Sequence, residues 1–208
     1  MKKRLSARQS FLVLELMVVF LFIVVTAAVM LSQSLTDADL WVLGVLYATR
    51  LPFLFDTFSY ITLLGNTLAI TVAASAIGLF LLFTKRFSLA VGLAVATIGA
   101  ASTEVTMKIL IERVRPSGFS DLLPSSFSYP SGHATASMAL YGFITYALLV
   151  VFPKQRVLIL SLGAFFILSV GISRLYLGVH YPSDVLGGYL LAAVWIFIAA
   201  RVMHLMRK

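Results

Sequence analysis

Residues 128–133 read Ser128-Tyr129-Pro130-Ser131-Gly132-His133, and long apolar runs lie on both sides of them. Pro130 disfavours helical angles at the residue before it, and Ser131 is a good N-cap for the apolar run that follows. A helix start attracts phosphate, because its backbone N–H groups are unpaired and its dipole is positive. Gly132 lets an anion approach the backbone, and His133 can exchange a proton near neutral pH. The same residues also fit a capped membrane helix with an incidental histidine, so the rest of the chain must decide.

The composition is that of an integral membrane protein. The chain has 208 residues, of which 61% are hydrophobic, and its mean hydropathy is +1.02, which no ordinary soluble domain reaches. Every long segment is of the same kind, so we expect one domain over residues 1–208. The absence of cysteine excludes disulfides, a thiol nucleophile and a Cys-based metal site. The net charge of +8 fits anionic lipid better than nucleic acid, because only 12% of the residues are charged.

The apolar segments predict an all-α bundle of six transmembrane helices, because only helices satisfy their own backbone in lipid. The first segment is a run of 21 residues that is apolar except for Glu15 and Thr26. It is longer than the roughly 7–15 residues of the apolar region of a signal peptide, and we interpret it as a retained span. Charged residues and prolines interrupt residues 32–64, which we expect to lie as an interfacial segment between the first two spans. The predicted spans are residues 11–31, 65–83, 87–111, 131–151, 157–172 and 185–200.

The distribution of charge predicts the orientation. Eleven cations fall on the side of the two termini: Lys2, Lys3, Arg4, Arg8, Lys85, Arg86, Lys154, Arg156, Arg201, Arg207 and Lys208. Five fall on the other side: Arg50, Lys108, Arg113, Arg115 and Arg174. Six acids share that side: Asp37, Asp39, Asp56, Glu112, Asp121 and Asp184. The positive-inside rule therefore predicts a multi-pass protein of the inner (cytoplasmic) membrane with both termini cytoplasmic.

Three polar stretches are expected at the outer face. In the first, Lys108 and Arg115 are seven residues apart, so they share one face if the helix continues to Arg115, where the following proline ends it. The second is the stretch around Pro130. In the third, a proline suited to the first turn of the last helix brings Asp184 within reach of His180. Such a carboxylate fixes the tautomer of the imidazole and leaves its other nitrogen basic.

These stretches together supply fixed cations, two histidines, one carboxylate and a helix N-terminus. Three cations beside two histidines and an aspartate would repel a divalent ion, so we expect no metal and no other cofactor. Cations around an anion site, with a histidine nucleophile and a histidine acid, suit phosphoryl transfer without a metal, because they neutralise the phosphoryl oxygens.

The three stretches resemble, in order and spacing, the motifs of the type 2 phosphatidic acid phosphatase family of membrane lipid phosphate phosphatases. The family pattern is Lys-x6-Arg-Pro, then Pro-Ser-Gly-His, then Ser-Arg-x5-His-x3-Asp. This chain matches it without departure at Lys108…Arg115-Pro116, Pro130-Ser131-Gly132-His133 and Ser173-Arg174…His180…Asp184. Each motif alone is weak, but the ordered set is highly specific.

The resemblance implies the catalytic roles. His180 would attack phosphorus to give a phosphohistidine, Asp184 would orient His180, and His133 would protonate the leaving oxygen and then activate water. The phosphate would be held by Lys108, Arg115, Ser131, Gly132 and Arg174. The resemblance also implies inhibition by vanadate.

The expected function is removal of phosphate from a membrane lipid phosphate or diphosphate at the outer leaflet. Undecaprenyl pyrophosphate, phosphatidylglycerol phosphate and phosphatidic acid all fit as substrates. A phosphotransferase that passes the phosphoryl group to another lipid fits the same residues. A transporter of anionic lipid is disfavoured, because only Glu15 and Glu104 are charged near the middle of a span. The sequence leaves the oligomeric state open.

Three charged residues outside the motif positions are given specific roles. We expect Arg50 and Arg113 to anchor lipid headgroups. Glu104 lies one helical turn before Lys108, and we hypothesise that the two side chains form an ion pair that holds the ammonium at the phosphate site. The alternative is that Glu104 is protonated, or bonds a hydroxyl such as that of Thr71 or Thr103, and only supports packing.

Overall fold

The computed structural model describes residues 7–120 and 124–206, and within them the chain is helical, with no strand. Lys2, Lys3, Arg4, Asp121, Arg207 and Lys208 lie outside the described residues, as does the side chain of Arg8. The helices are α1 (Ala7–Leu31), α2 (Gln33–Ala48), α3 (Pro52–Ile61), η1 (Thr62–Gly65), α4 (Thr67–Phe83), α5 (Phe87–Ile111), α6 (Gly132–Ser137), η2 (Met138–Gly142), α7 (Phe143–Val151), η3 (Pro153–Gln155), α8 (Arg156–Tyr176) and α9 (Pro182–Leu205).

The predicted membrane bundle is confirmed, with one qualification about the second span. Within residues 7–120 and 124–206, five helical segments are long and apolar enough to cross a membrane: Gln9–Leu31, Phe87–Ile111, Gly132–Val151, Pro153–Tyr176 and Pro182–Leu205. The helix α4 has 17 residues, and a rise of about 1.5 Å per residue makes it shorter than the hydrocarbon layer. It becomes a sixth span when joined to Pro52–Gly65, from which it is bent by 43°.

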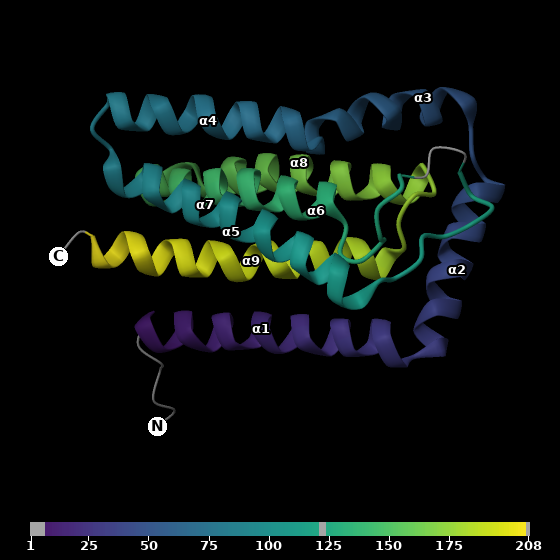
Figure 1. Cartoon of the computed structure of the whole chain (residues 1–208). Helices are drawn as coiled ribbons and strands as arrows, with labels where there is room; N and C mark the ends of the chain where they lie inside the picture. The colour runs from purple at the N-terminus through teal and green to yellow at the C-terminus, as the bar shows by residue number, and fades with distance from the viewer. Residues whose placement is uncertain (1–6, 121–123, 207–208) are drawn as a thin grey trace.

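The segment between the first two spans consists of two helices with different directions. Figure 1 shows α2 running across one end of the bundle, while α3 leads on to α4 along the same side of the bundle. The predicted interfacial segment therefore corresponds to α2, and α3 extends the second span. The loops that carry the three polar stretches lie at the same end of the bundle as α2, whereas α1 begins and α9 ends at the opposite end.

Small residues bring α5 and α9 close together at the centre of the bundle. A Cβ atom on Gly99 would lie 2.2 Å from the ring of Trp195, so the helices could not approach this closely with a larger residue there. Trp195 donates an indole hydrogen bond of 3.1 Å to Thr103. An ion pair between Glu15 and Arg201 joins α1 to α9 and neutralises one of the two carboxylates expected inside the spans.

Candidate active site

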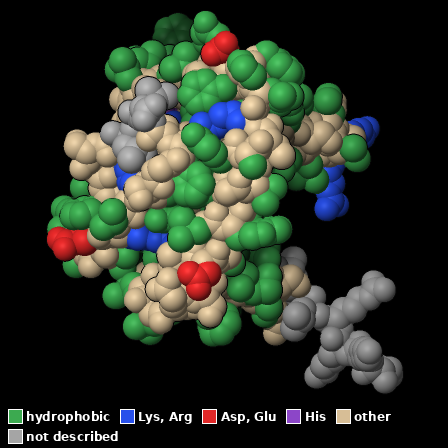
Figure 2. Space-filling model, turned by 90° about the vertical axis from the view of Figure 1, so that its right-hand side faces the viewer, with side chains coloured by type: hydrophobic (Ala, Val, Ile, Leu, Met, Phe, Trp, Pro, Cys, Tyr) green, Lys and Arg blue, Asp and Glu red, His purple; other side chains and the backbone are tan. Residues whose placement is uncertain are grey.

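The site lies between the loop that joins α5 to α6 and the loop that joins α8 to α9. Figure 2 views this end of the molecule, where Lys and Arg side chains appear in small patches among hydrophobic and uncharged atoms. The functional groups themselves lie deeper, since Arg115, Ser131, Arg174, His180 and Asp184 are all buried.

His180 and Asp184 meet as the sequence predicts. Pro182 occupies the first turn of α9, and one turn of helix brings Asp184 Oδ2 to 3.3 Å from His180 Nδ1. The same carboxylate oxygen accepts hydrogen bonds from the Ser128 hydroxyl and, at 2.9 Å, from the Tyr181 N–H. These contacts hold the carboxylate in one orientation, in which its Oδ2 atom faces His180.

Arg115 determines which nitrogen of His180 is free to react. Its Nη1 lies 3.0 Å from His180 Nε2, and a guanidinium can only donate hydrogen bonds. Nε2 therefore carries the lone pair, and Nδ1 carries the proton that faces Asp184. Arg115 is itself fixed by bonds of 2.7 Å to the Ser126 carbonyl and 2.8 Å to the Val179 carbonyl.

His180 is neutral at physiological pH. Burial lowers the pKa of its imidazole to about 4, although Asp184 acts in the opposite direction through a hydrogen bond and its charge. The charges of Arg115 and Arg174 lower the pKa further, because a cation disfavours a second positive charge nearby. A ring that stays neutral keeps the Nε2 lone pair available.

The stretch around Pro130 supplies the start of a helix, as predicted. Ser131 occupies the N-cap position of α6 without making a side-chain cap bond, and its buried Oγ has no hydrogen-bond partner among the described residues. Buried hydroxyls in proteins are usually hydrogen-bonded, so this one can donate to a further group. The stretch is tied to α9 by a 3.0 Å bond from the Ser131 N–H to the Asp184 carbonyl. The ring of His133, in the first turn of α6, lies within electrostatic range of Arg174, Arg115, Lys108 and His180.

The remaining two predicted cations come from separate helices. Arg174, in the last turn of α8, donates a 2.8 Å bond to the Thr62 hydroxyl, while its buried Nε has no partner. Lys108, in the last turn of α5, donates a 2.7 Å bond to the Phe127 carbonyl. All the predicted catalytic and phosphate-binding residues therefore converge on one end of the bundle.

One predicted piece of local geometry is wrong. The end of the span at residue 111 was predicted, but a helical face shared by Lys108 and Arg115 would require the helix to continue to Arg115, and α5 ends at Ile111. Glu112 adopts a left-handed conformation with φ of 50°, and its N–H closes the helix on the Lys108 carbonyl. Arg115 therefore reaches the site from a loop rather than from the helical face of Lys108.

The prediction that Arg113 anchors lipid headgroups is also wrong. Its guanidinium is buried and lies 2.6 Å from Asp184 Oδ1 and 2.8 Å from Asp39 Oδ2. Sequence reasoning missed both Arg113 and its partner Asp39 as parts of the site. The sequence did contain a signal for Arg113, because the positive-inside rule disfavours cations on the predicted outer face, where it lies.

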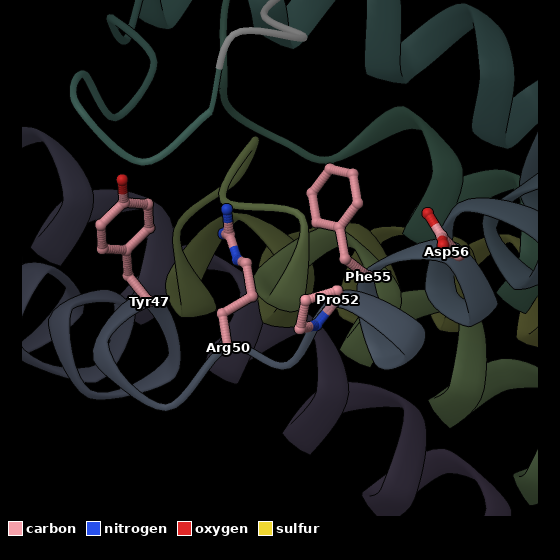
Figure 3. Close-up of a pocket in the computed structure, with 5 residues that line it drawn as sticks. All are labelled: Tyr47, Arg50, Pro52, Phe55 and Asp56. Carbon is pink, nitrogen blue, oxygen red and sulfur yellow. The ribbon is translucent and has the colours of Figure 1, made fainter.

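Arg50 is likewise engaged within the protein rather than with lipid. It donates bonds of 3.1 Å to the Phe119 carbonyl and 2.7 Å to the Tyr176 carbonyl, and its guanidinium lies 4.8 Å from the centre of the Tyr47 ring. Figure 3 shows Arg50 between the aromatic rings of Tyr47 and Phe55 in a cavity of about 510 Å³. This cavity is lined from α2 and α3 and includes none of the motif residues.

The described residues include no group of three or more His, Cys, Asp or Glu side chains placed to hold a metal ion. The donor set around His180 consists instead of guanidinium and ammonium groups, which compete with a divalent cation for the same anion.

A long apolar groove opens beside the site. It lies between α4 and α5, has a volume of about 1070 Å³, and is lined mainly by aliphatic side chains such as Ile70 and Leu79. At its inner end it reaches Glu104 and Gly132. The groove thus connects the membrane-facing side of the bundle with the first residue of α6.

Comparison with known proteins identifies the family. Residues 86–208 match the sequence profile of the PAP2 superfamily. The chain is 30% identical over 182 residues to phosphatidylglycerophosphatase B of Bacillus subtilis, covering 86% of this chain and 90% of that protein. The chain belongs to the PAP2 superfamily.

Two further similarities place this PAP2 protein among membrane phosphatases. It is 32% identical over 130 residues to an undecaprenyl-diphosphatase of Sulfolobus acidocaldarius, covering 60% of each chain. The crystal structure of a transmembrane PAP2-type phosphatidylglycerolphosphate phosphatase from Bacillus subtilis superposes with a TM-score of 0.82 at 28% identity, over 90% of this chain and 94% of that one. The helical membrane fold predicted from the apolar segments and the family predicted from the motifs are thereby confirmed.

Glu104 and Lys108 form the ion pair that their spacing suggests, with Oε1 3.3 Å from Nζ. The alternative partner Thr103 is engaged elsewhere, since its hydroxyl donates to the Gly99 carbonyl and accepts from Trp195. Glu104 Oε1 would also lie 2.9 Å from a Cβ atom on Gly132. Glu104 therefore contacts both the lysine and the start of α6.

We predict that Glu104 acts on turnover through Lys108. Glu104→Gln should lower kcat/KM about tenfold in the otherwise unchanged protein, and by less than about threefold when Lys108→Met is already present, because contacting residues couple. The measurement is a double-mutant cycle followed by phosphate release and by thermal unfolding. The exposed Glu112→Gln removes the same charge near the site and serves as the control. Effects that simply multiply would contradict the coupling.

Proposed function

We propose that this PAP2 protein is a lipid phosphatase that hydrolyses a lipid phosphate or diphosphate at the outer leaflet through a phosphohistidine on His180. The observation that carries the proposal is that a charged environment and an apolar environment meet at the site. A buried cluster of cations and a neutral histidine lies next to Glu104 and Gly132, two residues that line an apolar groove. A phosphate attached to a long hydrocarbon chain is the substrate that matches both.

Three cations, one hydroxyl and one backbone amide would hold the phosphate. Arg115, Arg174 and Lys108 neutralise its oxygens, and the Ser131 hydroxyl and the Gly132 N–H donate hydrogen bonds at the helix start. The unpartnered Ser131 Oγ and Arg174 Nε support this assignment, because a phosphate oxygen would satisfy both.

The reaction proceeds in two steps. In the first, the Nε2 lone pair of His180 forms a bond to phosphorus, the bond from phosphorus to the lipid oxygen breaks, and His133 gives that oxygen a proton. Asp184 stabilises the charge that develops on the imidazole. In the second step, His133 removes a proton from water, the resulting hydroxide attacks phosphorus, and the bond from phosphorus to nitrogen breaks. Inorganic phosphate leaves, and both histidines return to their starting states.

The names of the relatives suggest which lipids to test first. The relative that aligns over most of the chain is a phosphatidylglycerophosphatase, and a second one is an undecaprenyl-diphosphatase. Phosphatidylglycerol phosphate, undecaprenyl pyrophosphate and phosphatidic acid therefore form the substrate panel.

We predict that purified protein in detergent releases inorganic phosphate from at least one lipid of this panel, also in excess chelator, and that vanadate inhibits the release. His180→Ala should abolish turnover, whereas His204→Ala, a change of a histidine outside the motifs, should leave it intact. A radiolabelled substrate distinguishes release to water from transfer to a second lipid. Strict and reversible dependence on a divalent metal, or turnover by His180→Ala, would overturn the mechanism.

The orientation of the site has its own test, because the chain has no cysteine of its own. We predict that an impermeant thiol reagent labels Ser117→Cys from outside intact cells and Gln155→Cys only after the membrane is opened, since both side chains are exposed on opposite ends of the bundle. The reverse pattern of labelling would place the site on the cytoplasmic leaflet.

A further inference from the structure

A chain of buried charges runs from the helix α2 to the carboxylate of Asp184. Arg113 lies between two acids, with Nη1 2.6 Å from Asp184 Oδ1 and Nη2 2.8 Å from Asp39 Oδ2. Asp39 also accepts a 3.0 Å bond from the Ser183 N–H in the first turn of α9, and a bond from the Ser183 hydroxyl. The three charged side chains are largely buried, with exposed fractions of 9% for Arg113, 3% for Asp39 and 0% for Asp184.

The two oxygens of Asp184 serve different partners. Oδ1 contacts the Arg113 guanidinium, whereas Oδ2 contacts His180, Ser128 and the Tyr181 N–H. Arg113 therefore approaches Asp184 through the oxygen that does not face His180. Its guanidinium lies 4.0 Å from the centre of the Tyr181 ring, which packs against its face. This cation thus serves the carboxylate rather than the phosphate.

The physical need for such a cation follows from burial. A carboxylate that is out of contact with water is strongly disfavoured unless a charge and hydrogen bonds compensate it. The ring of His180 is neutral and cannot supply that charge. Arg113 supplies this positive charge from a planar guanidinium. Asp39 bonds the other terminal nitrogen of that group, so the guanidinium is held in one position.

We infer that Asp39 and Arg113 are positioning residues for the nucleophile: they hold Asp184 ionised and oriented, and through it fix the ring of His180. The inference rests on the proposed function, in which His180 attacks phosphorus. Asp39 lies on α2, which crosses the end of the bundle outside the three motifs (Figure 1). The geometry of the reacting nitrogen therefore depends on a helix that contributes no group to the phosphate site.

The test compares Asp39→Asn and Arg113→Gln with Asp37→Asn, an exposed acid on the same helix. We expect kcat to fall about 10–100-fold in Asp39→Asn, the range known for residues that orient a functional group from behind, and further in Arg113→Gln. KM and the inhibition constant of inorganic phosphate should change less than about threefold, because Lys108, Arg115 and Arg174 are untouched. Asp37→Asn should match the unchanged protein, and Arg113→Lys should recover part of the loss.

A second readout does not depend on turnover. In protein labelled with ¹⁵N-histidine in detergent, the Nδ1–H proton of His180 should give a slowly exchanging downfield signal, assigned by its loss in His180→Gln. The signal should persist in Asp37→Asn and be broadened or lost in Asp39→Asn and Arg113→Gln.

The two readouts separate the two claims. A protein without phosphatase activity that nevertheless shows this pattern of NMR signals refutes the proposed function and keeps the positioning role. Full kcat and an unchanged Nδ1–H signal in Asp39→Asn and Arg113→Gln refute the positioning role while phosphate release stands. A parallel loss of phosphate affinity and kcat, with the Nδ1–H signal retained, also refutes it, because the damage would then lie in the phosphate site.

Discussion

The structure depends on how the buried, ionised carboxylate of Asp184 is compensated by other groups of the protein. It is fully buried near the surface of a membrane bundle, and it is compensated on one oxygen by Arg113 and on the other by three hydrogen-bond donors. Removal of one partner from a buried ion pair typically costs about 3–5 kcal/mol, because a charge is left uncompensated. The loops on both sides, the start of α9 and the crossing helix α2 are arranged around this one group, and the tautomer of His180 follows from it.

The buried cations fall into two groups that have different partners. Arg115 lies at the His180 nitrogen that carries the lone pair, and Lys108 pairs with Glu104, whereas Arg113 contacts the oxygen of Asp184 that does not face His180. Glu104 and Asp39 each pair with one of these cations, so the buried charges come close to balance before any phosphate binds. Buried Ser131 and Arg174 atoms that lack partners remain on the side that would receive an anion. The apolar groove ends beside them, which is where a hydrocarbon chain attached to the phosphate has to leave.

Much of this was predictable from the sequence, for physical reasons. The thickness of the bilayer sets the length of a span, so segments such as 87–111 were predicted at the bounds of the observed helix. The spacing of His180 and Asp184 around a proline, and of Glu104 and Lys108 on one helix, fixes contacts that are local in the chain. The roles of Asp39 and Arg113 depend on a contact across 74 residues, and no local spacing reveals it. The departure of Arg115 from the helical face of Lys108 was missed, because the left-handed conformation of Glu112 has no strong sequence signal.

The central claim is that His180 Nε2 becomes bonded to phosphorus during turnover. Rapid quenching of the reaction with ³²P-labelled lipid phosphate, followed by digestion and peptide mapping, measures this directly. The account predicts a label that is stable in base and labile in acid, carried by the peptide that contains His180. The label should form and decay more slowly in His133→Asn, which lacks the group that protonates the leaving oxygen and activates water. A label on another side chain, or none in either protein during active turnover, would contradict the account.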